Sequence, residues 1–502
     1  MLSLKGIGGN GSDQVSYFVS KTPDGGFIMA LGSNSTSGPI VDSFCSTPAS
    51  SRIVFIKYNG DATTKKWSKC YAKNWSDTGY GFMFQTTDNK YIIGGVANSG
   101  NKWVIRKEDA SGNILWVKAY GGTGSQQLKS ILATEDGGYI FFGSAYGGDG
   151  DIGFHYGSAS TRDFWVLKVD INGNIEWSKV YGGTGDDIGA SVVTAPSGGC
   201  YIIGSTSSSD FDCVGNHGGT DAFVARLNKD GNIIWKRCLG GSGNDGGGEG
   251  GGCSAVSDDN DGILVATISG SENGDVSHQI NPTGSNIWVF NIDSSNNKMW
   301  DNCFGGGGAE FPNAICKSTD GDIWITGCSR VAGGQINQAY GDMDAVVFHI
   351  NHTGSFINAK VLGSSRQDRG YMIYPLTSGS IITGGFFCEN DGAFSGYPIN
   401  GTFPKIDAYL AVFTNWANEI QTFSYGDNIS VYPNPAFDLV NVHVNNNNKY
   451  AVIVNDITGK MVYYNSMETT LQIPLSGWHS GMYLMQLVDQ DGNRSVQKLI
   501  VQ

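Results

Sequence analysis

Hydrophobic residues in the first 415 positions occur in short runs separated by Gly-, Asn- and Asp-rich turns, and this arrangement recurs along the chain. The clearest copy starts at Asp163, where one apolar run leads through Asn172-Gly-Asn174 to a second run and then to Gly182-Gly-Thr-Gly. The next copy repeats this order from Asp221. The second run carries a tryptophan, which recurs at Trp67, Trp116, Trp177, Trp235 and Trp300.

Most copies also contain an Asp-Gly turn between two apolar runs, as at Asp24-Gly25 and Asp136-Gly137. Asp-Gly between alternating apolar residues is a strong hairpin signal. We therefore expect four antiparallel strands per copy: A before Asp-Gly, B after it, C from the Asp163-type residue, and D with the tryptophan. Four-stranded units repeated roughly every 60 residues predict the blades of a β-propeller.

Counting the strands predicts seven blades over residues 1–417. Seven A strands begin at Asp13, Asp77, Gln126, Asp187, Asp245, Glu310 and Asp368, but only six internal D strands are present. Lys5-Gly-Ile-Gly-Gly aligns with Lys179-Val-Tyr-Gly-Gly, so residues 2–7 are expected to supply the missing outer strand and close the last blade. Residues 420–425 are the alternative for that place, within an expected linker at 418–428.

Composition supports an all-β fold and narrows the partners. The chain has 74 glycines and only 12 prolines in 502 residues, which suits tight turns and is unlike collagen or a disordered chain. Its net charge of −14 argues against a nucleic-acid partner. No apolar run is long enough to predict a transmembrane segment.

Strand topology predicts which face binds. The D–A and B–C connections open on one face, and the B–C connections are the long ones, at about 33–51, 144–162, 205–220, 270–286, 329–343 and 387–406. Long loops on a rigid scaffold commonly carry binding. Six aromatic residues in them are candidates for stacking on a ligand: Tyr146, Phe154, Tyr156, Phe394, Tyr397 and Phe403. The alternative is that they pack the loops together.

Six of the seven A strands begin with an acid, and these acids would line one mouth of the central channel: Asp13, Asp77, Asp187, Asp245, Glu310 and Asp368. Oxygen ligands suit Ca²⁺, the one cofactor that the sequence suggests. The favoured interpretation is structural, with each carboxylate accepting backbone N–H groups of its own Gly-rich loop. The B–C loops add three Asp–His pairs, Asp151/His155, Asp212/His217 and Asp275/His278, for which hydrogen bonding is favoured over metal binding or acid–base chemistry.

Ten cysteines without a Cys-x-x-Cys motif fit no zinc site and favour an oxidising compartment. Cys45 and Cys70 occupy the same two places in the first repeat as Cys213 and Cys238 in the fourth, which predicts the bridges 45–70 and 213–238. Cys328 and Cys388 are a possible third pair. The remaining four cysteines stay unassigned.

The repeat stops near residue 428, and residues 429–502 contain about seven short alternating strands, the pattern of a small Ig-like β-sandwich. This segment resembles the type A C-terminal sorting domain of the type IX secretion system of Bacteroidota. The resemblance rests on Pro433, Asn434 and Pro435, on Gly459 and Lys460, on Gly481 and Tyr483, and on Lys498.

That resemblance implies export across the outer membrane by the type IX machinery, followed by release or attachment at the cell surface. Members of the family carry a signal peptide, which the start Met1-Leu2-Ser3-Leu4 does not resemble. We therefore expect the native precursor to begin upstream.

The leading functional hypothesis is a secreted or cell-surface binding or adhesion propeller that recognises a glycan or protein through its long B–C loops. The alternative is a secreted glycan-cleaving enzyme. No His-Glu-x-x-His, Gly-x-Ser-x-Gly or phosphate-loop motif is present, and equivalent repeated acids are poor candidates for unequal acid and base roles, so no catalytic residue is assigned. A passive surface protein without a specific ligand is the third possibility.

Overall fold

The computed structural model describes residues 3–7, 12–35, 52–72, 81–96, 102–247, 252–277, 279–280, 284–377, 379–395, 406–413, 429–432, 436–444, 449–456, 460–489 and 494–501. The chain divides into two compact units, Met1–Thr414 and Asn415–Gln502. Regular structure in the described residues is almost entirely β-strand, with two short 3₁₀ turns, η3 (Phe211–Cys213) and η4 (Gly392–Phe394).

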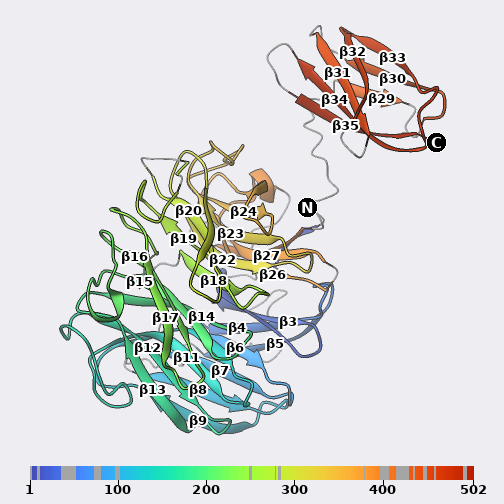
Figure 1. The fold of residues 1–502 in the computed structure, drawn as a ribbon. Coiled ribbons are helices and arrows are strands. Elements are labelled where there is room, and N and C mark those ends of the chain that lie inside the picture. The colour runs from blue at the N-terminus through green and yellow to red at the C-terminus, as the bar shows by residue number, and fades with distance from the viewer. Residues whose placement is uncertain are drawn as a thin grey trace. The chain divides into compact units, whose positions relative to one another are not determined.

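The described residues of the first unit form seven four-stranded antiparallel sheets (Figure 1). Sheets 1 and 2 contain β2 (Asp13–Lys21), β3 (Phe27–Ser33), β4 (Arg52–Tyr58) and β5 (Lys65–Ala72), then β6 (Phe82–Gln85), β7 (Tyr91–Val96), β8 (Trp103–Glu108) and β9 (Ile114–Tyr120). Sheets 3 and 4 contain β10 (Gln126–Ala133), β11 (Tyr139–Tyr146), β12 (Arg162–Val169) and β13 (Ile175–Tyr181), then β14 (Asp187–Thr194), β15 (Cys200–Thr206), β16 (Asp221–Leu227) and β17 (Ile233–Leu239).

Sheets 5 and 6 contain β18 (Cys253–Ser257), β19 (Ile263–Ser269), β20 (Asn286–Ile292) and β21 (Lys298–Phe304), then β22 (Glu310–Lys317), β23 (Ile323–Ser329), β24 (Asp344–Ile350) and β25 (Phe356–Leu362). Sheet 7 contains β26 (Arg369–Pro375), β27 (Ile381–Phe387), β28 (Asp407–Phe413) and, as its outer strand, β1 (Ser3–Gly6) from the N-terminal end. The β1–β28 pairing is antiparallel, with Ser3 opposite Val412 and Gly6 opposite Tyr409.

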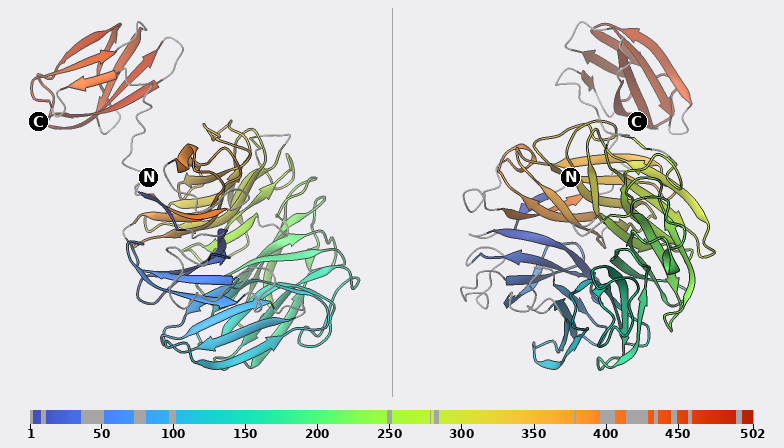
Figure 2. Two further views of the ribbon diagram at one scale, coloured as in Figure 1. Left: turned by 180° about the vertical axis from the view of Figure 1, so that it is seen from behind. Right: turned by 90° about the vertical axis from the view of Figure 1, so that its left-hand side faces the viewer.

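Neighbouring sheets contact one another mainly through their first strands, in chain order from sheet 1 to sheet 7, and β26 of sheet 7 contacts β2 of sheet 1. The sheets therefore follow one another around a closed circuit, a propeller-like arrangement that Figure 2 shows from two further sides. The alternative closing segment, residues 420–425, lies outside the described residues.

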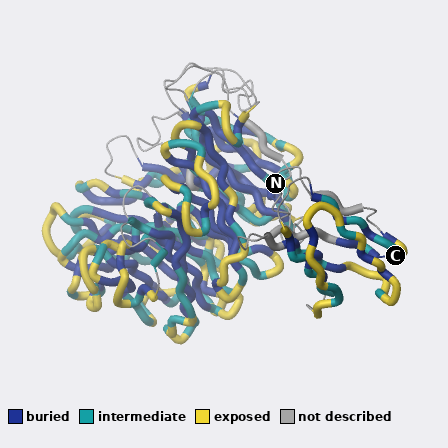
Figure 3. Tube along the Cα trace, turned by 90° about the horizontal axis from the view of Figure 1, so that it is seen from above, coloured by how far each residue is buried: buried dark blue, intermediate teal, exposed yellow. Residues whose placement is uncertain are grey.

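Packing between adjacent sheets forms the core, which Figure 3 shows as buried strands beneath exposed turns. Trp103 of β8 stacks on Trp165 of β12 with ring centroids 3.9 Å apart. Outer strands are joined by the repeated tryptophan: Trp177 Nε1 donates to the Lys229 carbonyl of the next sheet at 3.2 Å, and Trp235 does the same to Ser294 at 3.0 Å. The repeat of the sequence is thus a repeat of inter-sheet contacts.

The second unit packs two sheets face to face. One has the order β29 (Ile429–Tyr432), β30 (Leu439–Val444) and β33 (Thr470–Pro474), and the other β32 (Met461–Met467), β31 (Tyr450–Asp456), β34 (Gly481–Asp489) and β35 (Arg494–Val501). Inward residues of both sheets, including Val442, Ile473, Val452 and Leu487, share one buried cluster. The alternation of apolar and polar residues in these strands places every second side chain in that core.

Candidate functional site

The described acids predicted to start the A strands are buried inside the first unit, but Asp245 precedes its strand, β18, which begins only at Cys253. Asp13, Asp187, Asp245, Glu310 and Asp368 are at most 1% exposed, and Asp77 lies outside the described residues. Each of the following acids accepts a backbone N–H of its own Gly-rich loop: Asp187 from Gly183 at 2.8 Å, Asp245 from Gly241 at 2.7 Å, and Asp368 from Ser364 at 2.5 Å. These contacts give the acids a structural role in their loops.

A second set of buried acids starts the C strands. Asp163, Asp221 and Asp344 each accept a backbone N–H, from Tyr156 at 2.6 Å, His217 at 3.0 Å and Tyr340 at 2.7 Å. In each, the second carboxyl oxygen has no hydrogen-bond partner among the described residues. Among the described residues, no three His, Cys, Asp or Glu side chains lie together so as to hold a metal ion. A Ca²⁺ site therefore stays a prediction.

Burial raises the pKa of four of the acids in these two sets. It raises the pKa of Asp163 to about 8, with the nearby Asp187 carboxylate adding to the effect, and it raises the pKa of Asp187 to about 6. Burial likewise raises the pKa of Glu310 and of Asp368 to about 7 each. Loss of hydration destabilises the charged form, so these four acids stay protonated above their ordinary range.

In the described residues, five equivalent turns link the B–C loops to the preceding sheet, and we call them the rim turns: residues 149–152, 210–213, 273–276, 333–336 and 391–394. In each, the fourth residue donates its N–H to the carbonyl of the first, as in Cys213 to Asp210 at 2.8 Å. The third residue donates its N–H to the first glycine of the preceding Gly-rich loop, as in Asp212 to Gly182 at 2.9 Å and Asp275 to Gly240 at 2.8 Å. The long loops and the Gly-rich loops therefore lie on the same face.

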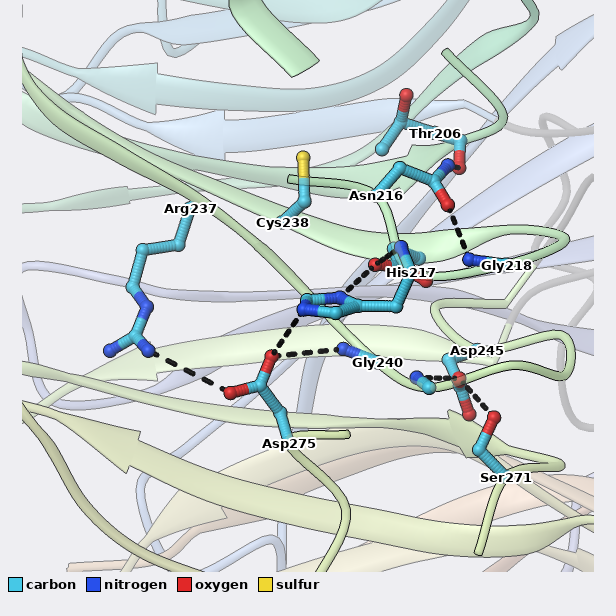
Figure 4. A network of polar contacts seen from close by, with 12 residues as sticks. Thr206, Asn216, His217, Gly218, Arg237, Cys238, Gly240, Asp245, Ser271 and Asp275 are labelled. Carbon is cyan, nitrogen blue, oxygen red and sulfur yellow. Dashed lines mark hydrogen bonds and ion pairs between the residues drawn. The ribbon is translucent and has the colours of Figure 1, made fainter. Parts of the chain in front are cut away.

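The aspartates of the rim turns bond to the preceding sheet, and Figure 4 shows these contacts around Asp275 and His217. Asp275 accepts the N–H of Gly240 at 3.4 Å across the sheet boundary, and its carboxylate lies 3.8 Å from His217 Nε2 and 3.8 Å from the Arg237 guanidinium. His217 Nδ1 contacts Asp221, not Asp212, at 2.8 Å. The Asp–His contacts of the described residues thus form within and between sheets and not within the sequence pairs that suggested them.

Of the other two Asp–His pairs, Asp151 and His155 do not contact each other, and the pair Asp275/His278 is only partly described. His155 lies 2.9 Å from the Thr161 carbonyl and 3.6 Å from Asp163, whereas Asp151 accepts the N–H of Gly121. His278 lies outside the described residues. Sequence proximity suggested a pairing that the loop geometry does not make, because the aspartate side chains turn toward the preceding sheet.

Three aromatic rings gather where the loops of sheets 3 and 4 meet. Phe154 is 55% exposed and meets Tyr156 edge-on at 4.7 Å, and Tyr156 contacts Phe211 at 4.9 Å. Phe211 is 58% exposed and was missed by the sequence analysis. An alignment of Asp210-Phe-Asp212 with Asp149-Gly-Asp151 and Asn273-Gly-Asp275 would have identified it as the departure from a repeated glycine.

The other aromatic candidates differ from this group. Phe394 is fully buried and stacks on Phe387 at 4.5 Å, so its assignment as a ligand-binding residue is wrong: it fills the space between its loop and the sheet. Tyr146 is part-buried beneath Arg162, whose guanidinium lies 5.6 Å from the ring centre. Tyr397 and Phe403 lie outside the described residues.

The cysteine predictions need correction. Cys213, Cys238, Cys328 and Cys388 are free and buried. The Cys238 thiol donates to the Cys213 carbonyl at 3.3 Å, and the Cys213 thiol faces Asp187 at 3.6 Å, so equivalent topology brings these residues together without joining them. Cys70 is disulfide-bonded, but its expected partner Cys45 lies outside the described residues, so the 45–70 bridge stays a prediction.

Part of the sorting motif is visible in the second unit. Tyr483 is buried, contacts Trp478 at 4.8 Å and donates its hydroxyl to the His479 carbonyl at 2.8 Å. Lys460 closes a turn by donating its N–H to Asp456 at 3.1 Å, Gly481 begins β34, and Lys498 lies in β35 opposite Leu484. Pro433, Asn434, Pro435 and Gly459 lie outside the described residues.

Comparison with known proteins identifies the C-terminal region. Residues 430–502 match the family of secretion system C-terminal sorting domains. Such a tail implies export by the type IX secretion system to the cell surface or beyond it, and interaction with that machinery. No helix in the described part of the chain is long and apolar enough to cross a membrane.

Other proteins show distant similarity to the chain. The regulatory protein FlaEY of Caulobacter vibrioides is 29% identical over 152 residues, which are 29% of this chain and 16% of that protein, so the chain spans less than a fifth of its length. The Neurospora crassa Pan2 WD40 domain aligns over 81% of this chain and 92% of its own, with 10% identity and a TM-score of 0.42. Hydrazine synthase of Kuenenia stuttgartiensis aligns over 61% of this chain and 75% of its own, with 12% identity and a TM-score of 0.37.

Proposed function

We propose that this is a secreted or cell-surface binding protein of a Bacteroidota bacterium, in which a seven-bladed β-propeller at residues 1–417 recognises an extracellular glycan or protein. An Ig-like sorting domain at residues 429–502 directs its export. The binding surface in this proposal is the face of the B–C loops, where sheets 3 and 4 meet. The observation that carries the proposal is the exposed aromatic group Phe154, Tyr156 and Phe211.

The loop face has the rigidity that binding favours. Each described rim turn is tied to the preceding sheet by a backbone hydrogen bond, and acidic side chains add further bonds, such as Asp210 to the Thr184 N–H at 2.8 Å. A surface that is ordered before its ligand arrives loses less conformational entropy on binding. The exposed rings therefore sit on a preorganised support.

Exposure separates these aromatics from those that hold loops together. Phe394 belongs to the same kind of loop and is buried, as a packing residue should be. Phe154 and Phe211 keep more than half of their surface in contact with solvent, and Val214 beside them is 69% exposed. Exposed apolar groups gathered in one place, with polar groups around them, are typical of interaction sites.

The glycan-cleaving alternative receives less support. Glycoside hydrolysis uses two carboxyl groups that reach the sugar from opposite sides. The acids whose pKa is raised into a useful range, including Asp163, Glu310 and Asp368, are at most 1% exposed. Their burial supports a structural role and leaves binding as the better-supported function.

The test is a binding screen of the full chain against glycan and extracellular-protein arrays. We expect a specific ligand whose binding falls at least tenfold in the Phe154→Ala variant. Tyr464→Ala is the matched control, because Tyr464 is also an exposed aromatic residue, 65% exposed, but lies in β32 of the second unit. Empty screens, or equal losses in both variants, would contradict the proposal.

A further inference from the structure

Phe211 stands at a backbone position that the other rim turns reserve for glycine. The second residue of each rim turn has a positive φ: 61° at Gly150, 70° at Gly274, 52° at Gly334 and 55° at Gly392. Phe211 has a φ of 48° at the same position. A bulky residue in this region is a genuine outlier, because its Cβ approaches a carbonyl oxygen.

The geometry of the turn requires glycine at this position, because there is no room for a Cβ atom. A Cβ on Gly274 would lie 2.3 Å from the Gly240 carbonyl oxygen, and one on Gly150 would lie 2.5 Å from that of Gly121. The same contact would be 2.5 Å at Gly392 and 2.8 Å at Gly334. In each turn this oxygen accepts the N–H of the next residue, and the corresponding bond from Asp212 to Gly182 is kept at 2.9 Å. Phe211 therefore adopts the glycine conformation without releasing the turn.

The Phe211 side chain makes few packing contacts that could offset this backbone strain. The Phe211 side chain is 58% exposed, and its one described ring contact is with Tyr156. The buried residue of the turn is its neighbour Cys213. Strain that is held in place by surrounding hydrogen bonds, at an exposed side chain, points to a function for that side chain.

The charges around Phe211 indicate what kind of ligand would stack there. The flanking residues Asp210 and Asp212 are part-buried, and the Asp212 side chain keeps 16% of its surface exposed. Lys236 pairs with Asp212 at 2.6 Å and Arg162 pairs with Asp186, and among the described residues no ion pair involves Asp210. An anionic sugar would be repelled by the Asp210 carboxylate, whereas an uncharged pyranose offers a C–H face to the ring and hydroxyl donors to the carboxylates.

We propose that Phe211 is the anchoring residue of the loop face, stacking on a sugar ring of an uncharged glycan, and that its left-handed backbone is kept for binding at the expense of stability. This inference rests on the proposed binding function and chooses the glycan over the protein ligand. It adds to the proposed function the anchoring residue and the class of ligand, neither of which follows from the exposure of the aromatic side chains.

The experiment combines stability and binding in the full chain, with dextran, mannan and xyloglucan as uncharged probes and alginate and heparin as anionic ones. Phe211→Gly restores the residue of the other four turns and should raise the melting temperature by about 2–4 °C, while uncharged-glycan binding falls at least tenfold. Phe154→Ala removes a neighbouring ring without relieving strain and should not raise the melting temperature. Gly274→Phe creates the strain elsewhere and should lower it.

The outcomes separate this inference from the proposed function. Lower stability in Phe211→Gly overturns the strain argument, and unchanged binding overturns the anchoring role while leaving binding itself in place. Preference for the anionic probes, or capture of a protein ligand alone, overturns the ligand class. A full chain that binds nothing overturns the proposed function and this assignment with it.

Discussion

Replacing Asp163 by asparagine should make the protein less sensitive to rising pH. Asp163 is fully buried in β12, one carboxyl oxygen accepts the Tyr156 N–H at 2.6 Å, and the other has no hydrogen-bond partner in the part of the chain that the structure describes. Asn286 occupies the equivalent position of β20 and accepts the Ile280 N–H at 3.3 Å, so an amide already fits this place in the fold. The substitution therefore removes a titrating group while keeping its shape and its acceptor.

The sign and size of the effect follow from the pKa. Burial raises the pKa of Asp163 from 3.8 to about 8, so below pH 4 the carboxyl is protonated in both the folded and the unfolded chain. As pH rises, the unfolded chain ionises first and the free energy of unfolding falls, until the folded carboxyl ionises near pH 8. Raising the pKa of Asp163 from 3.8 to about 8 corresponds to roughly 6 kcal/mol of unfolding free energy lost between pH 4 and pH 8.

The assay is equilibrium unfolding in guanidinium chloride at pH 5, 6, 7 and 8. The native chain should lose stability steadily as pH rises, because Asp187, Glu310 and Asp368 titrate in the same direction. Asp163→Asn should flatten that slope by several kcal/mol, and the reverse control Asn286→Asp should steepen it. Greater stability at pH 8 than at pH 5, or identical slopes in all three proteins, would refute the reasoning.

Three other predictions concern packing. Phe394→Ala should lower the free energy of unfolding by about 3–5 kcal/mol, because a fully buried ring leaves a cavity; denaturant titration measures it. Trp177→Phe should cost about 1 kcal/mol, from loss of the hydrogen bond to the Lys229 carbonyl, read as a fall in melting temperature. Burial raises the pKa of the Cys316 thiol, as it does at Cys200, so a thiol reagent should label the native chain slowly and at least eight sites after unfolding. Recovery of only six thiols would contradict the free state of Cys213 and Cys238.

The sheets were predictable because their signals are local and repeated. Asp-Gly turns and alternating apolar residues determine each hairpin within a few residues, and every copy confirms the alignment of the others. The same alignment anticipates the pairing of β1 with β28, because Lys5-Gly-Ile matches the end of an internal D strand. The pairing of β1 with β28 joins segments far apart in the sequence. It could be predicted only because the internal repeats of the chain show where a D strand pairs.

Contacts across the sheet boundaries were harder to predict. The alignment placed Cys213 near Cys238, but bonding depends on the direction of each thiol, which the equivalence of positions does not determine. The loop acids Asp151 and Asp275 accept N–H groups of the preceding sheet, and His155 contacts Thr161 and Asp163 instead of Asp151. The solvent exposure of the loop aromatics was equally hard to predict. Phe211 and Phe394 lie in equivalent rim turns, but the second position of the turn is exposed and the fourth is buried.

A residue that differs from its equivalents in the other repeats should therefore be judged by its effect on the contact that those equivalents make. Gln126 and Asn286 replace acids but keep a buried polar group, and Asn286 keeps the accepted N–H, so these changes leave the structural role intact. Phe211 is of the opposite kind, because it introduces a Cβ where four equivalent turns have none and exposes the ring that it adds. A repeat tolerates substitutions of the first kind without selection for anything new. The second kind works against folding, so it persists only where something other than folding favours it.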